Sequence, residues 1–305
     1  HLLWVGQGDW VLSGYNRVRM ILVTGAAGKT GQAVVKRLAA SGQRVRGLVR
    51  RQEQGVVLER LGVGEVVVGD MRVRRTLDQA AEGARAIYHI CPNMHPDEEI
   101  IGQNVIGAAR PAGIEHFVYH SVLHPQVEAM AHHWKKMRVE EMLFASGLSY
   151  TILQPAAYMQ NVLANWERIA REGVYAVPYA LETRLSMVDL DDVAEAAAIV
   201  LSEAGHAGAI YELCGSELLS QREVADILGQ RLGRDVTGET IPIEIWEQQA
   251  RSAGLGDYAV QTLVGMFRYY ERHDFWGNAN VLGWLLGRSP TTFSGFLERN
   301  IANIQ

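Results

Sequence analysis

Short apolar runs alternate with helix-like patterns through the first half of the chain. Runs rich in Val, Ile and Leu predict strands, and apolar residues spaced three and four apart predict helices. Buried parallel strands read as continuous apolar runs, as 66–68 (VVV) and 151–153 (TIL) do. The alternation is typical of a doubly wound parallel α/β sheet. The predicted strands are 20–24, 44–49, 65–68, 86–90, 116–120 and 149–153, and the predicted helices are 31–40, 54–61, 74–81, 98–112 and 129–146.

After Pro155 the pattern loosens and becomes mainly helical. Asp189 or Asp191 is placed to cap a helix over 189–203, and Ser220 with Glu223 forms a capping box before a helix that ends at 232. The other predicted elements are a helix at 158–172, strands at 185–188 and 209–213, and helices from 243 onward. We therefore expect one α/β domain, residues 20–154 plus 185–213, and a smaller, mainly helical lobe, residues 155–184 plus 214–305.

The segment VTGAAGKTG, residues 23–31, is a glycine-rich loop between the first strand and the first helix. Gly25 permits a tight turn, Gly28 lets a ligand approach the backbone, and Gly31 lets the helix pack closely on the strand. A diphosphate can then lie against the N–H groups and the positive dipole end of the helix. The loop predicts dinucleotide binding, although its G-x-x-G-x-x-G spacing differs from that of the older dehydrogenases.

The end of the second strand bears on which dinucleotide binds. Proteins that take NAD usually place an acidic residue there to accept from the ribose 2′-hydroxyl, whereas this chain has Arg50 followed by Arg51. A guanidinium can hold a 2′-phosphate with two hydrogen bonds, which favours NADP(H) over NAD(H). The alternative is that both arginines are solvated charges at a strand end.

Bulk properties exclude several classes of protein. The net charge of −5, with acidic and basic residues interspersed, argues against a nucleic-acid binder or a polybasic membrane-surface protein. No apolar run is long enough to span a membrane. Cys91 and Cys214 lie far apart, which favours a reducing cytoplasm over a disulfide framework. Residues 1–19 lack the features of a signal peptide, and we expect them to be a peripheral or non-native extension before a natural start at Met20.

Several motifs together carry a family resemblance. They are VTGAAGKTG, the strand end LVRR, VVVGD, VYHSV, the helical K-x-x-x-E, and SGLSYTILQPAAYMQN. The chain from Met20 onward resembles the NmrA-like branch of the atypical short-chain dehydrogenase/reductases. Lys136 to Asn161 is the most specific part. Members of this branch include NADPH-dependent quinone and dye reductases, and also cofactor-sensing regulators. The resemblance implies a Rossmann domain for the dinucleotide and a C-terminal substrate lobe.

The resemblance also implies positions for the cofactor. The loop residues expected around the diphosphate are Gly25, Ala27, Gly28, Lys29 and Thr30. On the adenosine side, Arg50 would hold the 2′-phosphate, Asp70 would accept from the adenine amino group, and Met71 would pack nearby. The segment after the fourth strand would line the adenosine ribose with Ile90, Cys91 and Pro92.

On the nicotinamide side, Ser121 would lie beside the ribose and Lys136 would hydrogen-bond its hydroxyls. The turn bordering the nicotinamide ring would consist of Pro155, Ala156, Ala157 and Tyr158.

The catalytic tyrosine of ordinary short-chain dehydrogenases is missing from this chain. Those enzymes carry Y-x-x-x-K on the helix, and here His132 stands one turn before Lys136. His132 or His133 could replace the tyrosine as proton donor, although the ammonium of Lys136 would lower the histidine pKa. The alternative is two exposed histidines at the start of a helix. Tyr158 is a second candidate donor, with packing at a lobe boundary as its alternative.

These features support three hypotheses about the function of the protein. The first is an oxidoreductase that transfers a hydride from NADPH to a quinone, dye or conjugated carbonyl, because a flat and strongly accepting substrate has less need of a dedicated acid. The second is a non-catalytic redox sensor that acts through a protein partner. The third, a sugar-nucleotide or isoprenoid epimerase or dehydratase, is disfavoured by the missing Y-x-x-x-K.

Other chemistry is disfavoured. A metal site built from His120, His124, His132 and His133 lacks a recognisable ligand spacing, so we expect none. Ser121 lacks the G-x-S-x-G elbow of a hydrolase. C-terminal aromatics could line a pocket for a flat substrate, although most are expected to pack in the core. A small-molecule substrate is expected, and an oligomer or a regulatory partner remains open.

Overall fold

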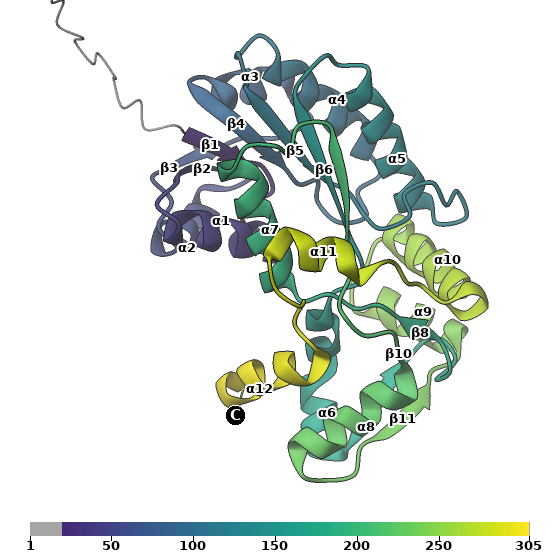
Figure 1. Cartoon of the computed structure of the whole chain (residues 1–305). Helices are drawn as coiled ribbons and strands as arrows, with labels where there is room; N and C mark the ends of the chain where they lie inside the picture. The colour runs from purple at the N-terminus through teal and green to yellow at the C-terminus, as the bar shows by residue number, and fades with distance from the viewer. Residues whose placement is uncertain (1–19, 305) are drawn as a thin grey trace, which may run out of the picture.

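The structure is a computed structural model that describes residues 20–304, so the expectation for residues 1–19 lies outside it. Within the described part, seven parallel strands form the central sheet in the order β3-β2-β1-β4-β5-β6-β9 (Figure 1). Their bounds are β1 (Met20–Val23), β2 (Arg44–Val49), β3 (Glu65–Val68), β4 (Ala84–His89), β5 (His116–His120), β6 (Tyr150–Pro155) and β9 (Ala209–Leu213). The predicted Rossmann-like α/β class is confirmed.

Helices cover both faces of this sheet, and each face has its own hydrophobic core. In β1, Ile21 and Val23 point into one core and Leu22 into the other, as the twofold period of a strand requires. The first core lies against α1 and α7, and the second against α3, α4 and α5. These helices are α1 (Lys29–Ala40), α3 (Arg74–Ala81), α4 (Glu98–Ala109), α5 (Ala131–Phe144) and α7 (Leu190–Ser202), with the short α2 (Gly55–Arg60) beside β3.

The strand order reverses between β1 and β4. From β1 the chain runs through β2 to β3 at one edge of the sheet, and it then returns to place β4 on the other side of β1. In open α/β sheets, ligands bind outside the carboxyl ends of the strands at such a reversal. The glycine loop follows the carboxyl end of β1, and Ile90 follows that of β4. The topology therefore points to this edge as the position of the site.

Elements of the first half lie within a few residues of their predicted bounds. Helix α4 ends at Ala109 rather than 112, because Pro111 has no N–H to donate to the Gly107 carbonyl, which accepts from the Arg74 guanidinium instead. In α7 the Asp189 carboxylate accepts from the Asp191 N–H, which selects Asp189 as the N-cap. The predicted capping box of Ser220 and Glu223 opens α8 (Gln221–Leu232).

The prediction was weaker after Pro155. The expected single helix at 158–172 is a 3₁₀ segment, η2 (Met159–Asn165), followed by α6 (Trp166–Glu172). Strand β8 (Arg184–Leu185) is shorter than predicted and pairs with β10 (Leu219–Ser220). The parallel pair β7 (Val174–Val177) and β11 (Thr237–Thr240) was missed, because β11 reads TGET and carries no apolar run.

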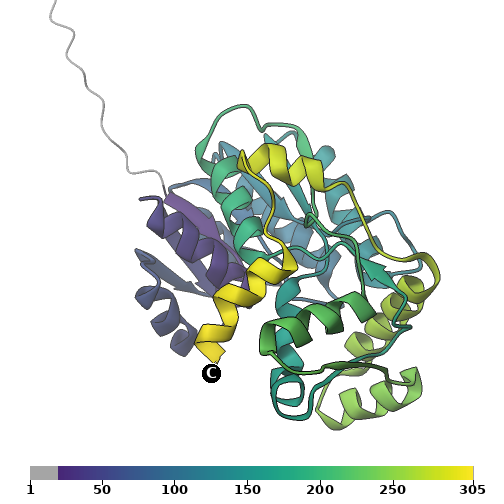
Figure 2. The same cartoon turned by 60° about the horizontal axis from the view of Figure 1, so that its bottom comes forward.

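The C-terminal helices divide between the two parts of the molecule. They are α9 (Ile243–Ser252), α10 (Asp257–His273), α11 (Ala279–Leu286) and α12 (Phe293–Ile304). Helix α11 packs against β9 and α7 of the sheet, whereas α12 packs against α8, as the turned view also shows (Figure 2). Helix α11, which we assigned to the helical lobe, therefore packs on the α/β domain.

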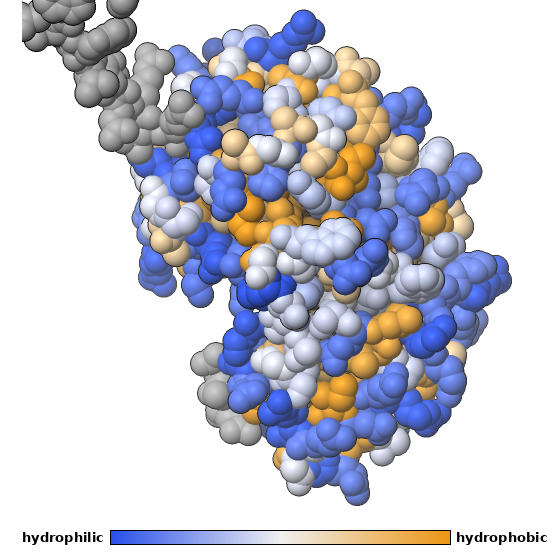
Figure 3. Space-filling model, in the orientation of Figure 1, coloured by the Kyte–Doolittle hydropathy of each residue, from blue (hydrophilic) through white to orange (hydrophobic). Residues whose placement is uncertain are grey.

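The aromatic residues of this region are mostly inside the protein. Tyr270, Phe275 and Phe293 are buried, as expected of core residues. Trp276 and Trp284 are the exceptions, at 55% and 76% exposed. The face shown in Figure 3 is largely polar with scattered apolar patches. None of the described helices is both long and apolar enough to cross a bilayer.

Candidate functional site

The glycine loop forms a cradle whose shape requires glycine at two positions. Gly25 has a φ of 60°, and a Cβ there would lie 2.7 Å from the Ile90 carbonyl oxygen. A Cβ on Gly31 would overlap the Gly25 carbonyl and lie 2.7 Å from the Ala26 Cα. Gly31 therefore lets the helix pack closely on the loop residues Gly25 and Ala26, and not on the strand as we expected.

Gly28 differs from the other two glycines. A Cβ there would meet only the Gly25 carbonyl oxygen, at 3.4 Å, so the space in front of it is open. Gly28 is also the N-cap of α1 and has no side chain to bond the first N–H groups of the helix. The loop thus presents backbone donors beside open space, with Ala27, Lys29 and Thr30 around it.

At the end of β2, the two neighbouring arginines differ in their surroundings. Arg51 forms an ion pair with Glu53 at 2.9 Å. Arg50 is exposed and, among the described residues, has no carboxylate within ion-pair distance. Arg50 is therefore the arginine that can take an anionic group.

Asp70, after β3, lies close enough to Arg50 for the arginine charge to favour its ionised form. Its carboxylate accepts from the Arg72 guanidinium at 2.6 Å and from the Arg72 backbone N–H at 2.9 Å. Hydrogen bonds from Arg72 lower the pKa of Asp70 to about 2, so it is an acceptor at neutral pH. Met71 follows it, partly buried against the second core.

The segment after β4 is bonded to the glycine loop. The Thr24 hydroxyl donates to the Ile90 carbonyl at 3.2 Å and accepts from the Ile90 N–H at 3.0 Å. Ile90 and Cys91 are buried and Pro92 is exposed. Burial raises the pKa of the Cys91 thiol, so it is no nucleophile at neutral pH.

Lys136 lies in a buried ionic cluster that the sequence did not reveal. Its Nζ donates to Glu98 Oε1 at 2.9 Å and lies 5.5 Å from the centre of the Tyr119 ring. The Tyr119 hydroxyl donates to the same Glu98 oxygen at 3.0 Å. Glu98 and Lys136 are only 2% and 8% exposed. An ammonium has three donors, so two remain for a ligand.

A second buried carboxylate, that of Glu140, lies on α5 one turn after Lys136 and bonds Ser121. The Ser121 hydroxyl donates to Glu140 Oε1, and the Gln154 amide donates to both Glu140 oxygens at 2.9 and 3.1 Å. Burial raises the pKa of Glu140. Glu140 therefore fixes the orientation of Ser121 at the end of β5.

His132 and His133 are both buried, so the alternative of two exposed histidines is wrong. Desolvation, with a smaller effect of the Lys136 charge, lowers the pKa of His132 to about 2 and that of His133 to about 4. Both rings are neutral at pH 7. Among residues 20–304, His132 Nδ1 is buried without a hydrogen-bond partner. His132 can therefore offer a neutral ring nitrogen, but not an imidazolium.

Tyr158 is joined to the end of β5 and faces the glycine loop. Its hydroxyl lies 2.7 Å from His120 Nε2 and 3.5 Å from Thr30 Oγ1. The preceding turn is held by Ala156, whose N–H donates to the Leu213 carbonyl, and by Ala157, whose carbonyl accepts from the Val188 N–H. Pro155 accepts from the Leu123 N–H. These bonds place Tyr158 between the loop and the Ser121 end of β5.

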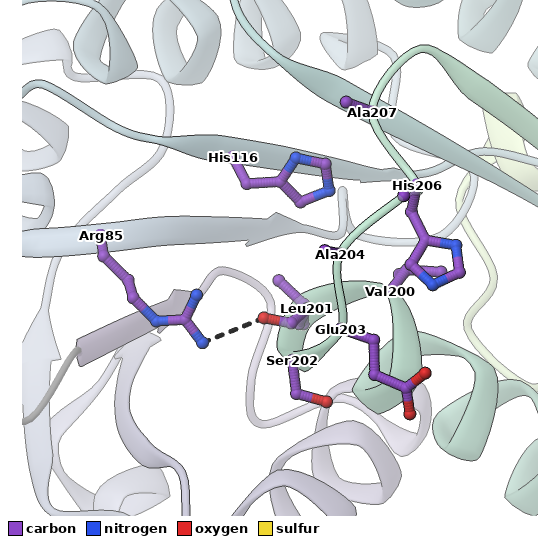
Figure 4. Close-up of a pocket in the computed structure, with 10 residues that line it drawn as sticks. Arg85, His116, Val200, Leu201, Ser202, Glu203, Ala204, His206 and Ala207 are labelled. Carbon is purple, nitrogen blue, oxygen red and sulfur yellow. Dashed lines mark hydrogen bonds between the residues drawn. The ribbon is translucent and has the colours of Figure 1, made fainter.

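Two pockets are lined by residues that do not belong to this constellation. One, of about 270 Å³, is at the amino ends of β4 and β5, where Arg85 donates to the Leu201 carbonyl and His116 and His206 form the lining (Figure 4). The other, of about 410 Å³, lies between the end of β9 and the loop after α10, beside His124, Tyr269 and Trp276. The first is at the opposite end of the sheet from the glycine loop.

Histidines, cysteines and carboxylates do not gather into a metal site. Within residues 20–304, no group of three or more of these side chains is arranged to hold an ion. His120 lies between two tyrosines, and His133 Nδ1 bonds the His124 carbonyl at 3.2 Å.

Sequence reasoning missed Glu98, Tyr88 and His120 as parts of this site. His120 was considered only as a metal ligand, and Glu98 only as the start of a helix. The available signal was the presence of polar side chains in strands buried on both faces, where apolar residues are the rule. Tyr88 and His120 are such side chains.

Comparisons with known proteins agree with this geometry. The chain is 28% identical to an NAD(P)H azoreductase of Xenophilus azovorans over 93% of this chain and 98% of that protein. It is 32% identical to a (4-alkanoyl-5-oxo-2,5-dihydrofuran-3-yl)methyl phosphate reductase of Streptomyces griseus, covering 86% and 90% of the two chains. The crystal structure of an NADPH-dependent quinone oxidoreductase from Escherichia coli, complexed with NADPH, superposes with a TM-score of 0.82 at 27% identity, over 92% of this chain and all of that one. The profile of the NmrA-like family matches residues 18–297, and the chain belongs to that family.

Proposed function

We propose that this protein is an NADPH-dependent reductase that passes a hydride to a quinone, a dye or another conjugated carbonyl compound. The observation that carries the proposal is the glycine cradle, with open space at Gly28 and the exposed Arg50 beyond it. The fold matches a quinone oxidoreductase that holds NADPH, and the sequence matches an azoreductase and a reductase of a conjugated furanone.

The residues present fit the dinucleotide. Backbone N–H groups at Lys29 to Gly31 would bond the diphosphate, because the Gly28 N–H already donates to the Gly25 carbonyl. The Arg50 guanidinium would bond the 2′-phosphate. Three N–H groups of Arg72 bond the Asp70 carboxylate, so one of its about four lone-pair sites remains for the adenine amino group. Ile90, Cys91 and Pro92 would line the adenosine ribose beside Met71. The exposed Arg50 disfavours NAD(H), which has no phosphate at that position.

Bound NADPH supplies the hydride, and the residues of this chain orient the reactants and exclude water. Lys136, held by Glu98, would direct its remaining donors to ribose hydroxyls. Ser121 would be oriented at the same ribose by Glu140. The turn from Pro155 to Tyr158 would border the reacting ring, and His132 lies one turn before Lys136 on α5.

Reduction of a carbonyl also requires a proton. His132 is neutral at pH 7 and is therefore a poor acid. Burial raises the pKa of Tyr158 to about 12, and its hydroxyl is protonated at neutral pH. Tyr158 is the proton donor in this proposal.

The proposal includes a cytoplasmic location and a small-molecule substrate. Both cysteines are buried free thiols, as a reducing compartment permits. The sensor hypothesis has less support, because the two sequence relatives described above are both named as reductases.

Steady-state oxidation of NADPH with a panel of quinones, azo dyes and conjugated carbonyls tests the proposal. We expect turnover on at least one class, with NADPH preferred over NADH. Tight NADPH binding without turnover on any of them would contradict the reductase assignment and favour the sensor.

A further inference from the structure

Tyr88, His120 and Tyr158 form a hydrogen-bonded row beneath the glycine loop. They come from β4, the end of β5 and the turn after β6. The Tyr88 hydroxyl lies 2.7 Å from His120 Nδ1, and His120 Nε2 lies 2.7 Å from the Tyr158 hydroxyl. Two tyrosine hydroxyls thus share one imidazole.

The position of the imidazole proton follows from the buried end of the row. Tyr88 is 0% exposed, and in the described part of the chain its hydroxyl has a single hydrogen-bond partner, His120 Nδ1. If Nδ1 carried a proton, the Tyr88 proton would be buried without an acceptor, which costs about 1–3 kcal/mol. Burial lowers the pKa of His120 to about 3, so the ring is neutral and has one N–H. Tyr88 therefore donates to Nδ1, and the ring proton is on Nε2.

This tautomer decides what Tyr158 can do. The Nε2–H donates to the Tyr158 oxygen, so the ring cannot accept the proton of that hydroxyl. Among the described residues, the other hydrogen-bond partner of the Tyr158 hydroxyl is Thr30, whose Oγ1 donates to the Tyr158 oxygen over a distance of 3.5 Å, the limit of a hydrogen bond. We propose that the buried Tyr88 hydroxyl fixes the His120 tautomer and thereby directs the Tyr158 proton toward an acceptor oxygen bound beside the glycine loop.

This inference rests on the proposed reductase function for its chemical consequence. A quinone that gains a hydride also gains one proton. The Tyr158 O–H bond breaks as the O–H bond to the quinone oxygen forms. The tyrosinate left behind accepts from His120 Nε2–H until solvent returns a proton. Tyr88 and His120 touch neither substrate nor cofactor in this scheme and are positioning residues.

Removal of the Tyr88 hydroxyl gives the direct test. In Tyr88→Phe, Nδ1 loses its donor and the ring can take the other tautomer, in which Tyr158 donates to Nε2. Nitrogen-15 NMR of the ligand-free protein distinguishes the two tautomers, and the His120 signals are those missing from His120→Gln. We expect the Nε2–H form in the unmodified protein and a mixture in Tyr88→Phe. An Nδ1–H form in the unmodified protein, or no change in Tyr88→Phe, would overturn the inference whether or not the protein is a reductase.

Kinetics give a second readout that a purely structural role would not produce. A quinone takes up a hydride and a proton, whereas a cationic triphenylmethane dye takes up a hydride alone. Tyr88→Phe is expected to lower kcat for the quinone about tenfold more than kcat for the dye, less than the ~10²-fold effect of losing a general acid. Its KM for NADPH should change less than twofold. Equal losses on both acceptors would contradict the inference.

Tyr175→Phe is the matched control. Tyr175 is also buried, and its hydroxyl donates to Gln221 Oε1 at a distance of 2.7 Å, away from the glycine loop. It should leave the quinone-to-dye ratio of kcat unchanged. A change in that ratio equal to that of Tyr88→Phe would overturn the inference. If the unmodified protein reduces neither acceptor, the proposed function fails and the NMR measurement alone decides the tautomer.

Discussion

The glycine loop and the polar cluster around Lys136 lie at the same edge of the sheet but are built in different ways. The loop depends on the backbone of one short segment, where Gly25 and Gly31 leave no room for a Cβ. The cluster depends on side chains from distant segments, with Lys136 on α5 and its partner Glu98 on α4. One half of the site is local in sequence and the other is assembled by folding.

This difference explains what could be predicted from the sequence. The sheet followed from apolar runs, and the loop followed from glycine spacing, since both depend on local chemistry. The Lys136–Glu98 pair and the row from Tyr88 to Tyr158 could not be predicted, because each partner is chosen by tertiary packing. The pair β7 and β11 was missed for the same reason, since β11 has no apolar pattern and is defined by its partner.

Removing Lys136 should have the largest effect on stability. Lys136→Met leaves Glu98 buried without its cation, and we expect a loss of about 3–5 kcal/mol in the free energy of unfolding, measured with urea. Lys135→Met is the control, because Lys135 is more exposed, donates to the exposed Pro96 carbonyl and lies 4.0 Å from Glu99, so that its loss leaves no carboxylate buried. It should cost about 1 kcal/mol. Equal losses would show that the cluster is not the stabilising element.

Alanine at two loop glycines should separate folding from binding. Gly31→Ala forces the loop backbone apart, and we expect a loss of more than about 2 kcal/mol in stability. Gly28→Ala places a methyl group in open space, so stability should change by under about 1 kcal/mol, while NADPH binding should weaken at least about tenfold. Unchanged NADPH affinity in Gly28→Ala would argue against a diphosphate at that position.

Charge reversal at Arg50 tests the cofactor preference. Arg50→Asp should weaken NADPH binding by about 1–3 kcal/mol and affect NADH much less, because only NADPH carries the 2′-phosphate. Arg51→Asp is the matched control, since Arg51 already pairs with Glu53. The interpretation fails if calorimetry gives the same loss for both variants, or none for Arg50→Asp.

Four buried histidines, His89 on β4, His120 on β5, and His132 and His133 on α5, predict an acid-sensitive fold. Burial lowers the pKa of His89 and His120 to about 3, of His132 to about 2 and of His133 to about 4. These values lie below the pKa of about 6.5 in the unfolded chain, so below pH 6.5 the unfolded state binds more protons. The contribution of these neutral histidines to the free energy of unfolding should be fully present above pH 6.5 and be lost progressively as the pH drops toward 4.

Each of these histidines contributes up to about 1.4 kcal/mol per pH unit in that window. Urea unfolding at pH 7, 6 and 5 measures the slope. His133→Leu should reduce it, because one buried ring no longer titrates. A slope that His133→Leu leaves unchanged would contradict the assignment of buried, neutral rings.

Titration calorimetry of the unmodified protein with NADPH tests the central claim most directly. If the loop after β1 holds the diphosphate of this cofactor, the titration will show saturable heat with one site per chain, and weaker binding of NADH. Absence of heat with either nucleotide at millimolar concentration would contradict the account.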